Sequence, residues 1–383
     1  MFFRLDDEQR EIQDLARTFA QREIAPHADM WDEEHHFPRE VLRPMAELGL
    51  AGLLTPEEYG GSALPRLIGA LIYEQLAQAD MATAVWLSVH NMVAGLIATF
   101  GDDAQKRRWL PRMASGEALG AFSLSEAHAG SDANALRATA QRDGDDYVLN
   151  GSKYWVTSAG EADIYAVMLR TDAEAGSKGV STFIVERDIP GFSIGKLERK
   201  MGLRSSPTGE LIFENCRVPA ANRLGAEGQG LKIALSSLNG GRVNIGAIAV
   251  GVAQAALDVA TRYAGERIAF GKPLGAFEGI QFMLADMAMK TQASRLLVYE
   301  AAWKVDNGEP SVTAAAMAKC FATDTAMAVT TDAVQTLGGA GYVRDWPTER
   351  YMRDAKVGQI FEGANQIQRI VIARGLLGDL TSV

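Results

Sequence analysis

The chain is poor in cysteine, with only Cys216 and Cys320 among its 383 residues. Neither cysteine lies in a CxxC pair or beside a histidine cluster. Two separated cysteines cannot build a disulfide framework or a cysteine-rich zinc site. We therefore expect a protein of a reducing, cytoplasmic compartment.

Basic residues are also fewer than acidic ones: the chain has 38 Lys and Arg and 48 Asp and Glu, which gives a formal net charge of -10. Nucleic acids and anionic membranes select for basic patches, so neither is expected as the main partner.

The first 26 residues carry acidic groups at amphipathic spacing, whereas export and transit sequences are basic and poor in acid. The apolar stretches are interrupted well before the roughly 18 residues of a membrane span. We expect no export signal and no membrane span.

Several familiar motifs are missing. No GxGxxG follows a strand pattern, and the Walker-like GERIAFGK has the wrong spacing and is followed by Pro273. The histidines of EEHHFP, at 33–38, lack the i,i+4 spacing of helical zinc ligands, and no GxSxG is present. These absences argue against a nicotinamide-binding Rossmann domain, a P-loop, a serine hydrolase and a metal site.

The length and the patterning of the chain divide it into three predicted domains. Helical spacing begins after Asp6, the expected N-cap, and stops at Pro26. It recurs over 41–48, 67–77 and 84–100, and a Pro- and Gly-rich loop, TPEEYGGSALP, interrupts it. The expected domains are a helical domain at 1–118, a β domain at 119–222 and a helical domain at 223–383.

The predicted middle domain is rich in β-forming residues. Asn150 and Gly151 separate two β-rich runs, which predicts a two-residue hairpin at this point. Further strands are expected at 164–170, 180–186 and 210–219. Long Ala- and Met-rich helices are expected beyond, at 280–305 and 312–338, with apolar residues on more than one face. The fold class is mainly α with a β middle domain, and the helices predict an oligomeric face.

One carboxylate has an unusual setting. In QIFEGANQIQR, Glu362 lies between Phe361 and Gly363, with Ile360 and Ala364 beyond. Charged side chains are rarely buried without a partner. Glu362 therefore either points at water or is kept dry for a chemical purpose, and the local sequence leaves both open.

Five segments, in this order, resemble the acyl-CoA dehydrogenase family. They are AFSLSEAHAGSDA at 121–133, GSKYWVTSAGEADIY at 151–165, ERIAFGKPL at 266–274, QTLGGAGYVRD at 335–345 and YMRDAKVGQIFEGANQIQRIVIARGLL at 351–377. The resemblance covers essentially the whole chain. It implies an N-terminal helical domain, a β-sandwich or barrel-like middle domain and a C-terminal four-helix bundle.

The resemblance implies FAD-dependent α,β-dehydrogenation of an acyl-CoA thioester. Glu362 matches the base that takes the α-proton, while the β-hydride passes to flavin N5. An apolar setting then has a reason, because desolvation raises a carboxylate pKa and strengthens the base near neutral pH. The thioester carbonyl would accept hydrogen bonds from the Glu362 N–H and a ribityl hydroxyl, and Gly363 allows the backbone to approach.

Other site residues follow from the same resemblance. Those implied for FAD are Phe122, Leu124, Ser125, Ser131, Trp155, Val156, Thr157, Arg267, Phe270, Gln335, Gly338, Gly339, Ala364 and Gln366. Those implied for the acyl-CoA substrate are Ser131, Asn239, Arg242 and Gly363. Arg242, in LNGGRVNIG, is expected at the start of a helix, where free backbone amides also favour anions. Taken alone, Trp155 would more often be a core residue of the β domain, and Arg242 a surface ion pair.

Three positions depart from the family pattern. Glu278 stands where many relatives carry Gln near the FAD pyrophosphate, and Ala364 replaces the usual Thr or Ser after the Glu-Gly pair. Ala127 and His128 replace the usual Pro and Gly in SEAHAGSD. These changes bear on cofactor affinity more than on the reaction.

The resemblance also narrows the substrate. Relatives with the base on another helix carry it immediately before the equivalent of Arg242, where this chain has Gly241. The stretches 88–92, 158–168 and 238–245 look most like isobutyryl-CoA dehydrogenases of valine breakdown. Alternatives are a linear short- or medium-chain dehydrogenase, an acyl-CoA oxidase or, in another class, a non-catalytic helical interaction protein. The family implies an electron-transferring flavoprotein as electron acceptor and a homotetramer built as a dimer of dimers.

Overall fold

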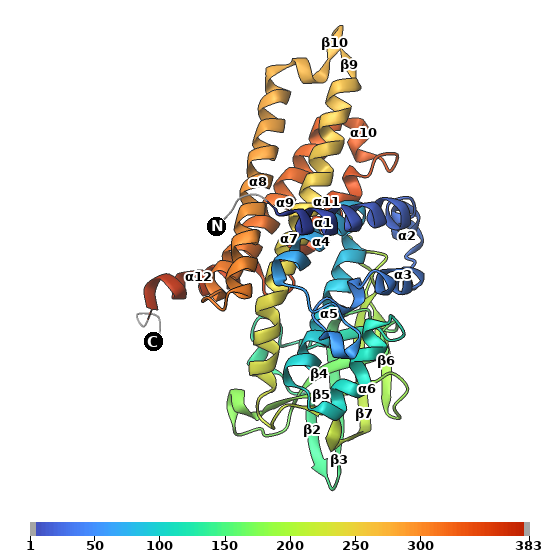
Figure 1. Cartoon of the computed structure of the whole chain (residues 1–383), viewed down its shortest axis with the longest axis vertical. Helices are drawn as coiled ribbons and strands as arrows, with labels where there is room; N and C mark the ends of the chain where they lie inside the picture. Colours follow the sequence, from blue (N-terminus) through green and yellow to red (C-terminus); the bar gives the residue numbers. More distant parts are fainter. Residues whose placement is uncertain (1–4, 379–383) are drawn as a thin grey trace.

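The computed structural model describes residues 5–378. Residues 1–4, which begin the predicted N-terminal domain, and 379–383, which end the predicted C-terminal one, lie outside the described residues. Helices occupy both ends of the described chain and a β-sheet its middle (Figure 1). This order of helix, sheet and helix confirms the predicted fold class.

The N-terminal helices include all four that the sequence predicts. Helix α1 (Asp7–Phe19) begins at Asp6, whose side chain accepts from Gln9 N at 2.8 Å while the Gln9 side chain accepts from Asp6 N at 3.2 Å. This reciprocal capping box explains the helix start. The others are α2 (Ala28–Glu34), α3 (Leu42–Glu47), α4 (Arg66–Ala79), α5 (Met81–Phe100) and α6 (Asp103–Ala114). Helices α2 and α6 were not anticipated.

The middle of the chain forms a mixed sheet at one end of the molecule (Figure 1). Its strand order is β6-β7-β3-β2-β4-β5-β8, and β1 pairs with β4 off this path. β4 pairs in parallel with β1 and β2, whereas the other pairs are antiparallel. The strands are β1 (Gly120–Ser123), β2 (Thr139–Asp143), β3 (Asp146–Thr157), β4 (Ile164–Arg170), β5 (Val180–Glu186), β6 (Phe192–Leu197), β7 (Thr208–Pro219) and β8 (Arg223–Leu224).

The hairpin predicted at Asn150 and Gly151 is wrong. Both residues lie inside the single long strand β3, and the turn that joins β2 to β3 contains Gly144, with φ +63°. Gly151 has φ +123°, and a Cβ there would lie 2.7 Å from the Cβ of Ala138. The register between β3 and β7 also shifts at this point. The Asn-Gly pair therefore marks a bulge, where glycine permits the conformation and a close backbone approach.

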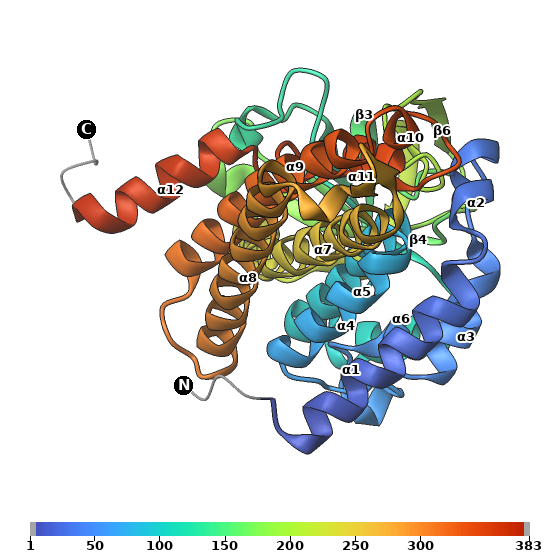
Figure 2. The same ribbon diagram turned by 90° about the horizontal axis from the view of Figure 1, so that it is seen from above.

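Long helices dominate the C-terminal part. Helix α7 lies between the α4–α5 pair and the α8–α9 pair (Figure 2) and packs against all four. The predicted helices at 280–305 and 312–338 are confirmed as α8 and α9. The elements are α7 (Gly230–Glu266), β9 (Ile268–Ala269), β10 (Lys272–Pro273), α8 (Glu278–Asp306), α9 (Val312–Leu337), α10 (Gly339–Tyr342), α11 (Thr348–Gly358) and α12 (Asn365–Leu377).

One hydrophobic core joins the three parts, because Trp86 of α5, Phe183 of β5 and Val298 of α8 belong to the same buried cluster. Helices α5 and α7 are long and apolar enough to cross a membrane by length and composition, but 89% of the apolar window of each is buried inside the fold. Their apolar character is thus explained by core packing.

Candidate active site

Glu362 lies in the short loop between α11 and α12. Its φ is +51° and that of Gly363 is +91°, so two successive residues adopt the left-handed region. A glutamate in this conformation is strained, and such strain often accompanies a functional site. A Cβ at Gly363 would lie 2.5 Å from Gln368 Nε2, so this position requires glycine for space as well as for its backbone angles.

The Glu362 carboxylate is desolvated. The residue as a whole is partly exposed, but its Oε2 is buried and has no hydrogen-bond partner within residues 5–378. Burial raises the pKa of Glu362 to about 7, and the positive charges of Lys319 and Arg242 partly oppose this rise. The group can therefore exchange a proton near neutral pH.

Two side chains hold the backbone of this loop. Lys319 Nζ, from α9, donates to the Gly363 carbonyl at 2.9 Å and to Asn365 Oδ1 at 2.9 Å. Gln368 Nε2, from α12, donates to the Gly363 carbonyl at 2.9 Å and to the Glu362 carbonyl at 3.2 Å. The sequence interpretation missed both residues. Lys319 could have been found as an isolated charge in an apolar Ala- and Met-rich helix.

Helix α7 forms the surface opposite the carboxylate. A Cβ at Gly241 would clash with Glu362 Oε2, so the carboxylate lies directly against the helix backbone. The next residue, Arg242, is in the interior of α7, and the prediction that it begins a helix is wrong. Interior helix amides are paired, so they offer no free N–H groups to an anion. Nor is Arg242 a surface residue, since it is only 8% exposed.

Further polar atoms near α7 are buried without hydrogen-bond partners among the described residues. They include Arg242 Nε, Arg66 Nε, the Tyr73 hydroxyl and Asn239 Oδ1. A Cβ at Gly240 would lie 2.8 Å from Arg66 Nη2, so Arg66 covers the same stretch of α7 as Glu362. Buried polar groups are usually paired. This group of atoms is therefore prepared for a polar ligand, and the sequence interpretation missed Arg66 and Tyr73.

The segments predicted to hold the flavin ring lie side by side. The Tyr154 N–H, from β3, donates to the Ser125 carbonyl, just after β1, at 2.9 Å. Trp155 has φ +62° and is 60% exposed, so it is not a core residue of the β domain. The other members of this set are Phe122 and Thr157, which are half-buried, Leu124 and Val156, which are buried, and Ser131, which is exposed.

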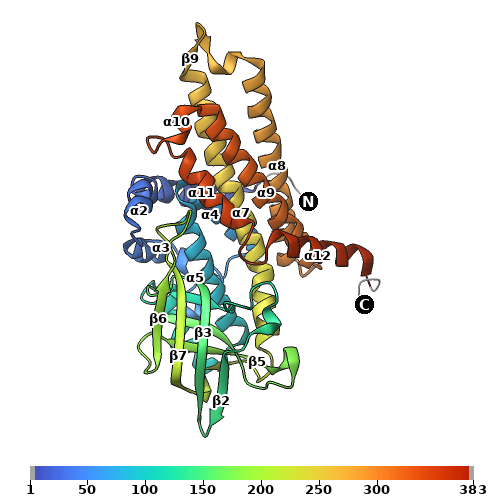
Figure 3. The ribbon, with the colours of Figure 1, turned by 180° about the vertical axis from the view of Figure 1, so that it is seen from behind.

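The structure places the remaining FAD candidates elsewhere. Arg267 and Phe270 lie at the β9–β10 hairpin, at the end of the molecule farthest from the sheet (Figure 3). Phe270 is 96% exposed, with φ +49°. Gln335, Gly338 and Gly339, at the end of α9 and the start of α10, are also exposed. Within one chain these residues do not meet the Trp155 segment.

The positions that depart from the family pattern have local structural settings. Ala364 is the N-cap of α12 and supplies no capping side chain, and Gln366, two residues later, is exposed. Glu278 is the exposed first residue of α8, where a negative charge is favoured by the helix dipole. His128 Nε2 lies 3.6 Å from Glu126 Oε2, and Glu126 is itself paired with buried Lys153 at 2.8 Å.

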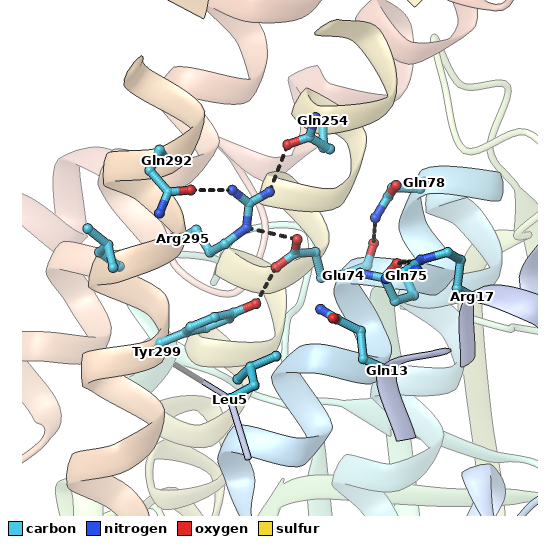
Figure 4. A pocket seen from close by; sticks show the side chains of 11 residues that line it. Leu5, Gln13, Arg17, Glu74, Gln75, Gln78, Gln254, Gln292, Arg295 and Tyr299 are labelled. Atoms are coloured by element: carbon cyan, nitrogen blue, oxygen red, sulfur yellow. Dashed lines mark hydrogen bonds and ion pairs between the residues drawn. The ribbon is translucent and has the colours of Figure 1, made fainter. Parts of the chain in front are cut away.

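A separate polar cavity of about 390 Å³ lies between α1, α4, α7 and α8 (Figure 4). Its buried carboxylate, Glu74, accepts from Arg295 Nε and from the Tyr299 hydroxyl, both at 2.9 Å. Arg295 also donates to Gln292 at 2.7 Å and to Gln254 at 2.8 Å. These charges are satisfied within the protein. The Glu362 site, with its unpaired polar atoms, is the stronger candidate for chemistry.

Comparison with family models identifies all three parts of the chain. The model described as "Acyl-CoA dehydrogenase, N-terminal domain" matches residues 6–117, that of the middle domain matches 121–216, and that of the C-terminal domain matches 228–377. These matches cover both helical parts and most of the sheet.

Individual proteins give the same result. The mitochondrial isobutyryl-CoA dehydrogenase of Dictyostelium discoideum is 46% identical over 98% of this chain and 90% of its own length. The butyryl-CoA dehydrogenase structure from Megasphaera elsdenii has a TM-score of 0.96 at 44% identity, covering 98% of this chain and all of the other. A chain in a structure described as the electron transferring flavoprotein of Acidaminococcus fermentans has a TM-score of 0.97 at 48% identity, with 99% and 100% covered.

Proposed function

The chain belongs to the acyl-CoA dehydrogenase family of FAD-dependent oxidoreductases, and we propose that it oxidises a short or branched, isobutyryl-CoA-like thioester to its 2-enoyl-CoA. Glu362 is the proposed base for the α-proton. The observation that carries this role is the buried, unpaired Oε2, held against Gly241 in a strained loop. A solvated loop glutamate would have neither the burial nor the raised pKa.

The reaction also requires a hydrogen-bond donor to the thioester oxygen, and the backbone at Glu362 can supply one. The Glu362 N–H donates to no group in the described part of the chain, so it is free to bind the thioester oxygen. A hydrogen bond aimed at the developing enolate oxygen is worth about 3 to 4 kcal/mol in comparable oxyanion sites. Lys319 and Gln368 hold the carbonyls of Glu362 and Gly363, which restrains the backbone that follows this N–H.

The residues beside β3 fit a flavin. A flavin held there would supply the hydride acceptor for the β-hydrogen. The exposed Trp155, next to the segment at 122–125, offers a flat apolar surface for the flavin ring. Buried Ser123 and Ser158 also carry hydroxyls without partners among residues 5–378. We propose that Phe122, Leu124, Ser125, Trp155, Val156 and Thr157 contact the ring of this cofactor, with Ala364 and Gln366 nearby.

A homotetramer, as a dimer of dimers, is part of the proposal. Arg267, Phe270, Gln335, Gly338 and Gly339 are exposed and remote from Trp155 in the same chain, so they can reach an FAD only across a subunit boundary. Helix α8 supports such a boundary, because it exposes large apolar side chains at every seventh position, which is the spacing of a helix-packing seam. These residues are Phe282, Met289, Leu296 and Trp303.

Substrate binding is proposed for Ser131, Asn239, Arg242 and Gly363. Because Arg242 lies inside α7, no free helix-terminal amides lie beside it to help bind an anion. Its guanidinium is nevertheless buried, and its Nε is unpaired within the described chain. Because a Cβ at Gly363 would lie 4.0 Å from Arg242 Nη2, Arg242 lies beside the Glu362 loop, and we place it at the thioester end of the substrate. Asn239 donates to Ser311 at 3.2 Å, while its buried Oδ1 stays available.

The branched acyl group is supported by the 46% identity to an isobutyryl-CoA dehydrogenase. The similarity to a butyryl-CoA dehydrogenase structure keeps a linear short-chain substrate as the second candidate. The stretch at 88–92 is one of those that resemble isobutyryl-CoA dehydrogenases, and its polar side chains bond within the fold. Ser88 accepts from Asn244 of α7 at 3.1 Å, while His90 and Asn91 bond to residues 50–53 and 120. An electron-transferring flavoprotein is the proposed acceptor and the cytoplasm the proposed compartment.

A panel of acyl-CoA esters with an artificial electron acceptor tests the proposal. We expect isobutyryl-CoA or 2-methylbutyryl-CoA to be oxidised at least as well as butyryl-CoA, with long straight chains poor. Overlap is expected, because one methylene changes discrimination by about 1 to 3 kcal/mol. A clear preference for octanoyl-CoA would reverse the assignment. A purified protein that neither retains nor takes up FAD would support a non-catalytic scaffold instead.

A further inference from the structure

We propose that Lys319 is a positioning residue for proton abstraction: its ammonium group holds the Glu362 loop in shape and stabilises the ionised form of Glu362. This inference rests on the proposed function of Glu362. It adds Lys319, on helix α9, as a residue that acts through Glu362 and not on the substrate itself.

The burial of Lys319 requires an explanation. Its side chain is fully buried, and a buried ammonium group is costly unless it is paired. No carboxylate lies within ion-pairing distance of its Nζ in the described part of the chain, where its acceptors are the Gly363 carbonyl and Asn365 Oδ1. A neutral donor could make either bond. The positive charge therefore serves something other than these two hydrogen bonds.

The loop shows why charge matters here. Gln368 already supplies a neutral donor to the Gly363 carbonyl, at 2.9 Å. Lys319 donates to the same oxygen at 2.9 Å and brings a cation close to the desolvated carboxylate of Glu362. Burial lowers the pKa of Lys319 to about 8, and Glu362 is the strongest of the groups that oppose this. The cation and the carboxylate thus stabilise each other across the bend.

The other charged groups around Lys319 do not replace this role. Arg242, from α7, is a second cation facing Glu362 and disfavours the charge on Lys319. Asp324, on α9 itself, is paired with Arg369 at 2.6 Å and accepts from Asn365 at 2.8 Å. Cys320 is a buried thiol whose pKa is raised by burial. Glu362 is therefore the carboxylate near Lys319 that lacks a direct ion pair.

Lys319→Met tests the proposal, with Thr323→Val as the matched control. Thr323 is also on α9 and, like Lys319, bonds Asn365 at the start of α12, since Asn365 Nδ2 donates to Thr323 Oγ1 at 2.9 Å, but it carries no charge. Lys319→Gln keeps an amide donor and removes the charge, and Lys319→Arg keeps the charge.

Two readouts separate positioning from general damage. The first is the pH dependence of kcat/KM with isobutyryl-CoA. The second is the exchange of the α-protons of acetyl-CoA in D2O, which needs the base but no hydride transfer, because acetyl-CoA has no β-carbon. Loss of the positive charge should raise the pKa of Glu362, so in Lys319→Met and Lys319→Gln we expect the acidic limb of the kcat/KM profile to move up by about one pH unit. This is the lower end of the range for loss of a nearby opposite charge. At pH values below this limb, α-proton exchange should slow about tenfold.

Lys319→Arg should restore the wild-type limb, and Thr323→Val should leave it in place. The proposal is overturned if Lys319→Gln keeps the wild-type profile, or if Thr323→Val shifts it equally. Failure of the proposed function looks different: wild type would oxidise no acyl-CoA, or Glu362→Gln would exchange the α-protons as fast as wild type.

Discussion

The change Glu362→Gln tests the site most directly. It keeps the shape of the side chain in its place against Gly241 and removes the lone pair that we propose takes the α-proton. Positioned proton transfer contributes a factor of about 100 to 10,000, so we expect turnover to fall by at least this amount. FAD should stay bound, since the segments proposed to contact its ring lie around Trp155.

The same variant has a calculable effect on stability. The pKa of Glu362 rises from 4.5 to about 7 on folding, which corresponds to at most about 3.5 kcal/mol, at about 1.4 kcal/mol per pH unit. Because the folded-state pKa is the higher one, the unfolded chain ionises first as the pH rises above 4.5, and wild type loses this stability until the pH passes about 7. Glutamine does not titrate. The variant should equal wild type near pH 4.5 and be the more stable near pH 8.

Turnover, bound flavin absorbance and denaturant unfolding at pH 4.5 to 8 measure these effects. Glu278→Gln is the control, because Glu278 is an exposed carboxylate at the start of α8 and should affect flavin retention more than turnover. Near-normal rates in flavin-loaded Glu362→Gln would show that this carboxylate is not the base. A stability difference that does not change with pH would show that the carboxylate is not desolvated.

Three further changes have expected outcomes. Ala364→Ser supplies the missing cap of α12 and should raise stability in denaturant unfolding by about 0.5 to 2 kcal/mol; no change would mean that a serine at this position does not cap the helix. Gly241→Ala places a methyl group against Glu362 Oε2, and displacing the base by about 1 Å should slow turnover about 100-fold with FAD retained; an unchanged rate would contradict the tight contact. Met289→Asp puts a charge in the exposed α8 seam and should reduce the mass measured by light scattering, whereas an intact tetramer would place the subunit contact elsewhere.

Much of the fold could be predicted from local sequence. The capping box at Asp6 and the apolar spacing of α4, α5, α8 and α9 depend on residues three or four positions apart, so they are visible in the chain itself. The change from helix to strand near residue 119 is equally local. The exact domain boundaries and the roles given to individual site residues stay predictions.

Local patterns failed where distant contacts decide the structure. Asn150 and Gly151 have the composition of a hairpin turn, but pairing with β7 and the approach of Ala138 make this a bulge in a continuous strand. Arg242 follows two glycines and was expected to open a helix. It lies inside α7 because that helix packs against α4, α5, α8 and α9 along its length, and tertiary packing outweighs the low helix propensity of glycine.

The sequence by itself determined that Glu362 has apolar neighbours along the chain and a glycine after it. Only the tertiary structure decided that its carboxylate is buried against Gly241 and that Lys319, 44 residues away from Gly363, donates to that glycine. The physical reason is that desolvation and charge interaction depend on distance in space. Four elements, α7, α9, α11 and α12, have to pack before an ordinary glutamate becomes a carboxylate with a pKa of about 7, as the proposed base requires.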